Sequence, residues 1–247
     1  MAQSANERFR PSGLSALGMV VAATQPQDNI CTGTLIGTDR VLTAAHCLVD
    51  QEVGGWVSPS DTVFFAGQSA HDYTLQRRVR RILVHPDFDP DLWSDATDAP
   101  FDDLVPQIHA DVAVLELARP VRKARVAPVD VSQTAAFAGP VAVFGYGHVD
   151  TDALKPYPGC LLFYRDATSV SLSCRVEPGV SGAPMVGELD GAWQIFGVVS
   201  VIRYGTFVGT MGPRVTSARL SELRDIRQKE TTPFNSAKRS GKTAPKK

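Results

Sequence analysis

Short apolar segments recur along the whole chain, and glycine, proline and aspartate separate them. Clear examples are GMVVAAT, GTLIG, TVFFAG, RRILV, DVAVLEL, VAVFGYG and WQIFGVVSVI. Many short strands with turn residues between them are typical of an all-β barrel or sandwich, because α/β folds alternate their strands with helical patterns. The pattern therefore predicts an all-β fold.

Two regions depart from the strand pattern. In TSARLSELRDIRQKE, the apolar residues Leu220, Leu223 and Ile226 recur at three-residue spacing behind a threonine and a serine that can cap a helix, which predicts a C-terminal helix. The segment 87–111 is rich in aspartate and proline and has no apolar period, so we expect a long loop there. Its carboxylates suit calcium chemically, but the spacing of a calcium-binding loop is absent, and we assign no metal or cofactor to the chain.

Composition and charge limit the possible classes of protein. The 247 residues, of which 43% are hydrophobic, are enough for one large domain or two small ones. No apolar run is long enough to span a membrane as a helix, and the polar opening MAQSANERFRPSG lacks the apolar core of a signal peptide. The formal net charge of -1 argues against a dedicated nucleic-acid-binding protein, because such proteins carry a basic face.

The end of the chain differs from the rest in composition. The stretch SAKRSGKTAPKK carries only basic charges among small residues. This composition predicts a disordered tail, which we place at residues 231–247. The tail is either a solvated terminus or a tether to anionic polymers or membranes.

Four cysteines fall into two pairs that are local in the sequence, Cys31 with Cys47 and Cys160 with Cys174. Four cysteines allow three pairings, but each local pair would close a loop of about fifteen residues, for which a disulfide contributes roughly 3 kcal/mol. A zinc site would need cysteines about two to four residues apart, and none are so close. We therefore expect two disulfides and an oxidising compartment, either extracellular or periplasmic.

A histidine and an aspartate lie at the ends of predicted strands. His46 lies near the end of VLTAAHC, where small residues allow close packing and Cys47 holds the backbone, so its imidazole would keep the single orientation that a general base requires. Asp111 opens DVAVLEL and is either a cap at the strand edge or a buried carboxylate that accepts the Nδ1–H of His46. Asp102 and Asp103 are nearby rivals, but neither opens an apolar strand, so we favour Asp111.

The stretch EPGVSGAPM, residues 177–185, places one serine, Ser181, in a loop of glycine, alanine and proline. Taken alone, it is either an ordinary surface turn or a shaped loop that points backbone N–H groups at one spot, as an oxyanion site requires. With His46 and Asp111 it completes a triad in the chain order His, Asp, Ser. The α/β-hydrolases and the subtilisin-type enzymes have other orders, so only the chymotrypsin-like order fits.

The motifs CTGTLIGTDRVLTAAHC, VHPDF, DVAVLEL, FGYG, GVSGAP and the terminal helix together resemble those of the chymotrypsin/trypsin-like serine peptidases. The resemblance covers residues 18–226, and the spacing in CRVEPGVSGAP is similar to that of bacterial, glutamyl-endopeptidase-like members. It implies two packed six-stranded antiparallel barrels with the triad in the cleft between them. We therefore expect an N-terminal segment at 1–17, a first barrel at 18–125, and a second barrel with the helix at 126–230.

By this resemblance the chain is expected to be a serine endopeptidase, a secreted or periplasmic monomer that acts on protein or peptide substrates. The Ser181 hydroxyl would attack the scissile carbonyl and His46 would take its proton and later give it to the leaving amine. Asp111 would orient His46. The backbone N–H groups of Gly179 and Ser181 would form the oxyanion hole.

The same resemblance places the specificity pocket. Arg175 stands six residues before the nucleophile, where trypsin-like members have an aspartate at the pocket floor, so cleavage after Lys or Arg is disfavoured. The pocket wall is expected at Ser200, Val201 and Ile202, with Thr210 near a second wall position. Ile202 replaces a glycine and would shorten the pocket, which favours small apolar residues. Alternatively, Arg175 faces the pocket and selects acidic residues.

Departures from the family pattern leave a second function open. Val180 stands where most members have the aspartate that pairs with a new N-terminus after activation, and the N-terminal region has no activation sequence. We expect apolar packing of Val180 to shape the oxyanion loop without such processing. Val180, Ala183 and the partly closed pocket also fit a catalytically silent homologue that acts as a binding module. Nucleic-acid binding by the basic tail is a third alternative.

Overall fold

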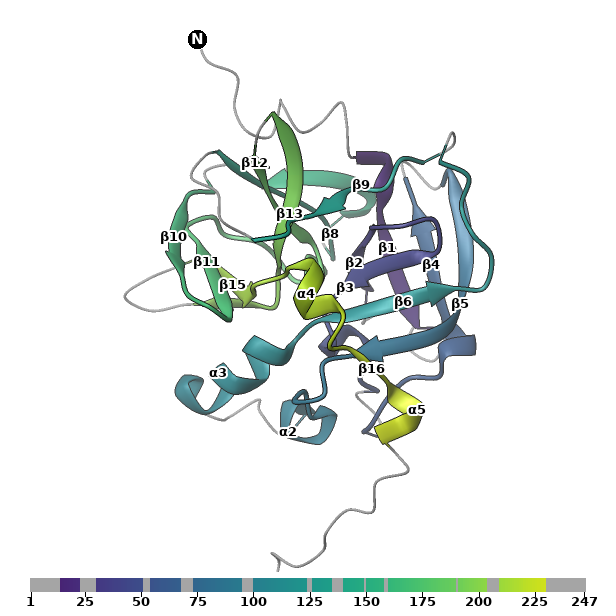
Figure 1. Cartoon of the computed structure of the whole chain (residues 1–247), viewed down its shortest axis with the longest axis horizontal. Coiled ribbons are helices and arrows are strands. Elements are labelled where there is room, and N and C mark those ends of the chain that lie inside the picture. Colours follow the sequence, from purple (N-terminus) through teal and green to yellow (C-terminus); the bar gives the residue numbers. More distant parts are fainter. Residues whose placement is uncertain are drawn as a thin grey trace, which may run out of the picture.

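The structure of the protein is a computed structural model in which strands form two halves that lie side by side. The purple and blue N-terminal strands form one half, and the green C-terminal strands form the other (Figure 1). Strands are the commonest elements, which confirms the expected all-β class. The residues that the structure describes are 14–22, 30–50, 54–67, 73–94, 100–123, 126–134, 140–148, 150–157, 160–189, 191–203 and 209–229.

The N-terminal half is a closed antiparallel barrel. Its strands are β1 (Leu17–Ala22), β2 (Ile30–Leu35), β3 (Arg40–Thr43), β4 (Thr62–Ala66), β5 (Leu75–Val84) and β6 (Ala113–Leu117). The sheet order is β16-β5-β4-β1-β2-β3-β6, with β16 (Arg224–Asp225) at the edge, and β5 also pairs with β6. This additional pairing closes β1 to β6 into a six-stranded barrel, as the resemblance implies.

The alternation of apolar and polar residues explains how β5 lies in this barrel. Leu75, Val79, Ile82 and Val84 are buried, whereas the glutamine and arginines between them are partly or fully exposed. Successive side chains of a strand point to opposite faces, so one face of β5 packs on the core and the other meets solvent. The alternation shifts between Val79 and Arg81, where the register with β6 is irregular.

The C-terminal half contains two sheets. One has the order β7-β13-β12-β8-β9, and the other has the order β10-β11-β15-β14. Their strands are β7 (Asp130–Val131), β8 (Val141–Gly147), β9 (Asp150–Tyr157), β10 (Leu162–Arg165), β11 (Ser169–Leu172), β12 (Pro184–Leu189), β13 (Ala192–Val198), β14 (Val201–Arg203) and β15 (Gly209–Pro213). A bridge between Gly197 and Arg214 connects the sheets. In the described residues the second half is thus a pair of sheets, and the expected domain boundaries remain predictions.

The region 87–111, which we expected to be a loop, contains the helices α2 (Pro90–Ser94) and α3 (Phe101–Ala110). The carboxylate of Asp89 caps α2 by accepting two backbone N–H groups of its first turn. Two aspartates in the first turn of α3 favour that helix, because they complement its dipole. Pro106 lies inside α3 and hid it, because proline is normally excluded from helix interiors. The loop prediction was wrong for both segments.

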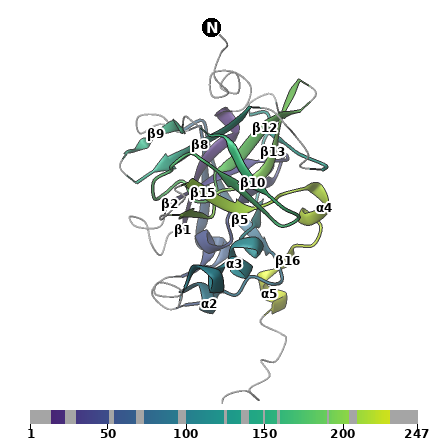
Figure 2. The same cartoon turned by 90° about the vertical axis from the view of Figure 1, so that its left-hand side faces the viewer.

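The expected C-terminal helix is divided into α4 (Ser217–Leu220) and α5 (Ile226–Lys229), with β16 between them. Thr216 caps α4 by accepting the N–H of Arg219 at 3.2 Å. The helix is interrupted because the main chain of β16 pairs with the end of β5. Leu223 is nevertheless buried, as its apolar character predicts. In both views α2, α3 and α5 lie at the same end of the molecule (Figures 1 and 2).

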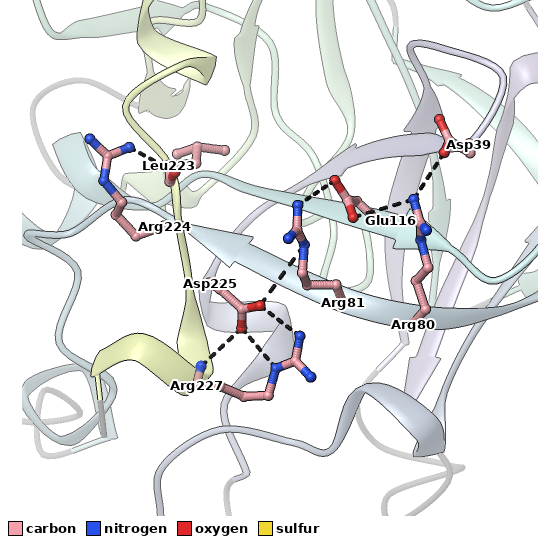
Figure 3. Close-up of polar contacts among 8 residues, drawn as sticks. All are labelled: Asp39, Arg80, Arg81, Glu116, Leu223, Arg224, Asp225 and Arg227. Carbon is pink, nitrogen blue, oxygen red and sulfur yellow. Dashed lines mark hydrogen bonds and ion pairs between the residues drawn. The ribbon is translucent and has the colours of Figure 1, made fainter. Parts of the chain in front are cut away.

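Paired charges attach β16 to the first barrel (Figure 3). The buried carboxylate of Glu116 on β6 lies 3.5 Å from the guanidinium of Arg80 and 2.9 Å from that of Arg81. Asp225 lies 3.9 Å from Arg81 and 2.7 Å from Arg227. The hydrogen bond from Arg227 holds the pKa of Asp225 below its ordinary value. The ion pair between Asp225 and Arg81 thus joins the C-terminal segment to the N-terminal barrel.

Both expected disulfides are present, Cys31 with Cys47 and Cys160 with Cys174. No helix in the described ranges is both long and apolar enough to cross a membrane. The predicted basic tail and most of the predicted N-terminal segment lie outside the described residues. Short 3₁₀ helices cover Leu14–Ala16, His46–Leu48 and Pro59–Asp61.

Candidate active site

His46 lies three residues after the end of β3, in the 3₁₀ helix that begins at this residue. Its neighbour Cys47 is joined to Cys31 of β2, so the disulfide holds this turn against the barrel. The backbone N–H of His46 donates to Oδ1 of Asp111 at 2.8 Å, and its Nδ1 lies 2.7 Å from Oδ2 of the same carboxylate. A proton on Nδ1 leaves Nε2 as the ring nitrogen that can accept another proton.

Asp111 lies between the end of α3 and the start of β6 and is 0% exposed. A buried carboxylate is costly unless donors surround it. Besides His46, the hydroxyl of Ser200 donates to Oδ2 at 2.5 Å. The rival residues Asp102 and Asp103 are exposed in the first turn of α3. The carboxylate that contacts His46 is therefore the one that opens the apolar strand.

Trp93 covers one face of the His46 imidazole. The two rings are stacked, with centroids 4.8 Å apart and planes inclined by 14°. Trp93 belongs to α2 and also contacts the buried ring of Phe88 at 5.6 Å, which in turn contacts Trp56 at 5.8 Å. Trp93 thus packs on one face of the imidazole and restricts its movement. This contact could not be predicted from the sequence, because α2 lies in the segment expected to be a loop.

The loop that carries Ser181 is a series of tight turns. The N–H of Val180 donates to the carbonyl of Glu177, and the N–H of Ala183 donates to the carbonyl of Val180. Gly182 has a φ of 81°, a conformation that favours glycine, and a Cβ there would lie 2.2 Å from the carbonyl oxygen of Thr32. Gly182 is thus explained by a loop that packs closely on the first barrel.

The N–H groups of Gly179 and Ser181, which we expected to form an oxyanion hole, are potential donors. Among the described contacts, neither N–H donates to a carbonyl or to a side chain. The carbonyl of Ser181 accepts the N–H of Thr32, and the N–H of Gly182 donates to the carbonyl of Val199, each at 2.8 Å. The loop is thus held by other backbone groups while these two donors stay available.

The serine loop adjoins the segments that carry the other two predicted catalytic residues. A Cβ at Gly182 would lie 3.1 Å from the backbone N of Ala44, two residues before His46. Val199, which accepts the N–H of Gly182, directly precedes the serine whose hydroxyl contacts Asp111. In the described part of the chain no hydrogen bond joins the Ser181 hydroxyl to His46, whose Nε2 lies 3.9 Å from the sulfur of Cys47. Such bonds often tighten only when substrate is bound.

Glu177, at the start of the serine loop, is held by two side chains of β9. Its Oε1 accepts the hydroxyl of Tyr157 at 2.8 Å and lies 3.3 Å from Nζ of Lys155. A Cβ at Gly147 of β8 would lie 2.2 Å from the Glu177 carboxyl, so a larger residue there would displace the Glu177 side chain. Burial raises the pKa of Tyr157 above its ordinary value, and the hydrogen bond and charge of Glu177 raise it further.

The residues expected to shape the specificity pocket lie at different depths. Ile202 of β14 and Thr210 of β15 are opposite each other in register, and Thr210 is fully buried with its hydroxyl 3.2 Å from the carbonyl of Val201. Arg175 is exposed. The hydroxyl of Ser200 donates its hydrogen bond to Asp111. The structure thus brings the two wall segments together, and the role of Arg175 stays a prediction.

One group of residues with the spacing of metal ligands occurs at the site. A sulfur of Cys31, a sulfur of Cys47 and a ring nitrogen of His46 lie within 4.8 Å of one another. Both sulfurs belong to the disulfide, and a disulfide sulfur is not the thiolate that binds a metal. This group therefore gives no reason to assign a metal.

The chain matches a family model described as Trypsin over residues 15–161. It is 32% identical over 102 residues to Transmembrane protease serine 9 of Rattus norvegicus, a match that covers 41% of this chain but only 8% of the rat protein. Its fold is similar to that of Glu endopeptidase in complex with MPD, with a TM-score of 0.61 at 16% identity over 90% of this chain and 93% of that one. It is also similar to the thermostable serine protease AL20 from an extremophilic microorganism, with a TM-score of 0.63 at 15% identity over 85% and 95% of the two chains.

Proposed function

The chain belongs to the trypsin family of serine peptidases, and we propose that it is a serine endopeptidase whose triad is His46, Asp111 and Ser181. The observation that carries this proposal is the buried carboxylate of Asp111, which accepts two hydrogen bonds from His46. This pair supports the role of His46 as a general base, because it holds the ring in one orientation and one tautomer.

The proposed reaction has two halves. The Ser181 hydroxyl attacks the carbonyl carbon of the scissile peptide while Nε2 of His46 takes the serine proton, and His46 then gives this proton to the leaving amine. An acyl-enzyme remains on Ser181. Water attacks the acyl-enzyme with His46 again as the base, and the serine recovers its proton when the acid product leaves.

The oxyanion hole is proposed at the N–H groups of Gly179 and Ser181, and Val180 is proposed to shape it. Each donor of such a hole typically contributes about 2.7 to 4 kcal/mol. Val180 is fully buried in the core of the second half, and a Cβ at Gly145 would lie 2.8 Å from its Cγ1. Apolar packing here supports a loop that needs no ion pair with a new N-terminus. Activity that required N-terminal processing of the purified protein would contradict this.

We propose that cleavage follows small apolar residues. The side chain of Ile202 packs on the core of the second half and faces buried Thr210 across the strand pair, which supports a short pocket. Selection of acidic residues by Arg175 is the alternative. Digestion of a peptide library, analysed by mass spectrometry, separates the two, and cleavage mainly after Lys or Arg would contradict both.

Covalent labelling tests the proposed activity. We expect a fluorophosphonate to label the folded protein, and we expect Ser181→Ala to abolish both the labelling and the cleavage of peptides. The second candidate is a silent homologue that acts as a binding module, which the replacement of the usual aspartate by Val180 favours. Folded wild-type protein that resisted labelling would support this candidate.

The two disulfides support a place of action outside the reducing cytosol. We propose that the protein is secreted or periplasmic and that its partners are protein or peptide substrates. Loss of activity on incubation with a reductant, with recovery after oxidation, is the expected behaviour. Full activity and unchanged thermal stability in reductant would remove this support.

A further inference from the structure

Thr32 of β2 connects the N-terminal barrel to the loop that carries Ser181. The residue is 0% exposed. Its backbone N–H donates to the carbonyl of Ser181 at 2.8 Å, and its hydroxyl lies 3.3 Å from the carbonyl oxygen of Gly179. The same hydroxyl lies 2.9 Å from the backbone N of Tyr146 in β8. The buried side chain of Thr32 therefore forms hydrogen bonds with both the serine loop and β8.

The proton of this hydroxyl has a defined direction. The N–H of Tyr146 can only donate, so the Thr32 oxygen accepts there and its own proton is free for the carbonyl of Gly179. The other end of the residue is also held, because the Thr43 hydroxyl donates to the Thr32 carbonyl at 2.9 Å. A Cβ at Gly145 would lie 3.1 Å from the Thr32 hydroxyl oxygen, so this hydroxyl packs closely against the backbone of β8.

The hydrogen bond to Gly179 acts on the peptide in the middle of the proposed oxyanion hole. The two proposed donors are the N–H groups of Gly179 and Ser181, and the peptide between Gly179 and Val180 lies between them in the chain. Its carbonyl accepts the Thr32 hydroxyl, and its N–H donates to the carbonyl of Glu177 at 3.2 Å. Both ends of this peptide are therefore held, which limits rotation of the donors on either side.

We propose that the Thr32 hydroxyl is a positioning group that orients the peptide between Gly179 and Val180 and so aims both oxyanion donors. This role rests on the proposed function of those donors. Thr32 does not touch the reacting atoms. Its effect is therefore expected on the step that forms the oxyanion, not on the binding of substrate.

Three variants test the kinetic consequence. Thr32→Val keeps the shape of the side chain and removes the hydroxyl, and we expect kcat to fall about 10- to 100-fold with KM within about twofold. Thr32→Ser keeps the hydroxyl and is expected to retain kcat within about threefold. The matched control is Thr34→Val on the same strand, because Thr34 is also 0% exposed but its hydroxyl has no partner among the described residues. We expect kcat of this control to stay within about twofold of wild type.

A second measurement does not depend on activity. In ¹⁵N-labelled protein we expect the amide signals of Gly179 and Ser181 to shift in Thr32→Val and to stay near their wild-type positions in Thr32→Ser. Thr32→Ala takes the place of the valine variant if that variant does not fold, since it also removes the hydroxyl.

The outcomes separate the two proposals. Unchanged amide signals and kcat in Thr32→Val, or an equal loss of kcat in Thr32→Ser, would overturn the positioning role. Failure of the wild-type protein to label with fluorophosphonate would overturn the proposed peptidase activity instead. In that case the amide signals alone still decide whether Thr32 orients the loop.

Discussion

The hydroxyl of Ser200 donates a 2.5 Å hydrogen bond to Oδ2 of Asp111, the same oxygen that lies 2.7 Å from Nδ1 of His46. Ser200 was expected only as part of the wall of the specificity pocket. Ser200 directly precedes β14, and its neighbour Val199 is held by the serine loop, which brings Ser200 to the buried carboxylate. Ser200 thus links the proposed pocket to the proposed triad.

Removing this hydroxyl is the first test. In Ser200→Ala the carboxylate of Asp111 loses one donor in a buried place, and a hydrogen bond to a charged group contributes about 1.5 to 3 kcal/mol. We expect kcat/KM for a peptide substrate to fall about 10- to 100-fold while the protein stays folded. Steady-state kinetics with circular dichroism as the control measures this. Wild-type kcat/KM in the variant would show that Asp111 needs no third donor.

The ring of Trp93 is expected to assist His46. An aromatic face next to an imidazolium stabilises the charge by about 0.5 to 2 kcal/mol, and His46 becomes an imidazolium in each half of the proposed reaction. We expect Trp93→Ala to lower kcat about 3- to 30-fold and Trp93→Phe to retain most of it. Parallel assays of the two variants on one peptide decide this. Equal losses in both would mean that ring stacking is not the cause.

Glu177 is expected to stiffen the serine loop through Tyr157. Glu177→Gln keeps the shape and removes the charge, so we expect the pKa of Tyr157 to fall in the variant, because the charge and the hydrogen bond of Glu177 raise it in addition to burial. Loss of a charge-assisted bond should also lower the free energy of unfolding by about 1 to 2 kcal/mol.

Urea unfolding of wild type and Glu177→Gln measures this loss, and Tyr157→Phe removes the same hydrogen bond from its other partner. Equal free energies of unfolding in wild type and Glu177→Gln would contradict the contact.

Two histidines should make the fold sensitive to mild acid. Burial, followed by the charge of Arg219, lowers the pKa of His85 despite Asp87 and Glu222 nearby. Burial also lowers the pKa of His109, and Arg219 adds to this while Asp166 opposes it. A histidine whose folded pKa is below the ordinary value of 6.5 binds its proton more readily in the unfolded chain. The contribution of the two histidines to the free energy of unfolding is therefore fully present above about pH 6.5. It decreases as the pH falls below that value.

Urea unfolding at about pH 7.5 and pH 5 measures this decrease. Asp166 stays ionised across that window; burial opposes its ionisation, but hydrogen bonds from Thr168 and Ser169 lower its pKa to about 2. Replacing His109 by glutamine should reduce the difference between the two pH values. An unfolding free energy that is equal at both would contradict the prediction.

Much of the fold and part of the site could be predicted from local patterns. Short apolar runs between turn residues predicted strands. Burial of one face of a strand makes apolar and polar residues alternate, and this alternation can be read from a short stretch of sequence. The cysteine spacing predicted both disulfides, since each closes a short loop. The motif around His46 and the strand opened by Asp111 predicted two residues that do form a hydrogen bond. The catalytic role of Ser181 remains a prediction.

The helices were predicted less well than the strands. Pro106 hid α3, which forms because Ile108 and Ala110 are buried and its first turn carries two aspartates. The helical period of the C-terminal segment did predict buried Leu223, but pairing of β16 with β5 divided the helix. The helical spacing of apolar residues predicts which side chains are buried. Whether the segment forms a helix or pairs with another strand depends on the rest of the fold.

The sequence by itself determined the fold class, the disulfide pairs and the positions at which chemistry is expected, because these depend on residue types and on short spacings. Only the tertiary structure decided which side chains support them. Ser200 lies 89 residues from Asp111 in the chain, and Thr32 lies 147 residues from Gly179. The residues next to a buried serine or threonine in the sequence do not reveal the partner of its hydroxyl. That hydroxyl acquires a role only when folding brings a distant partner within hydrogen-bonding distance.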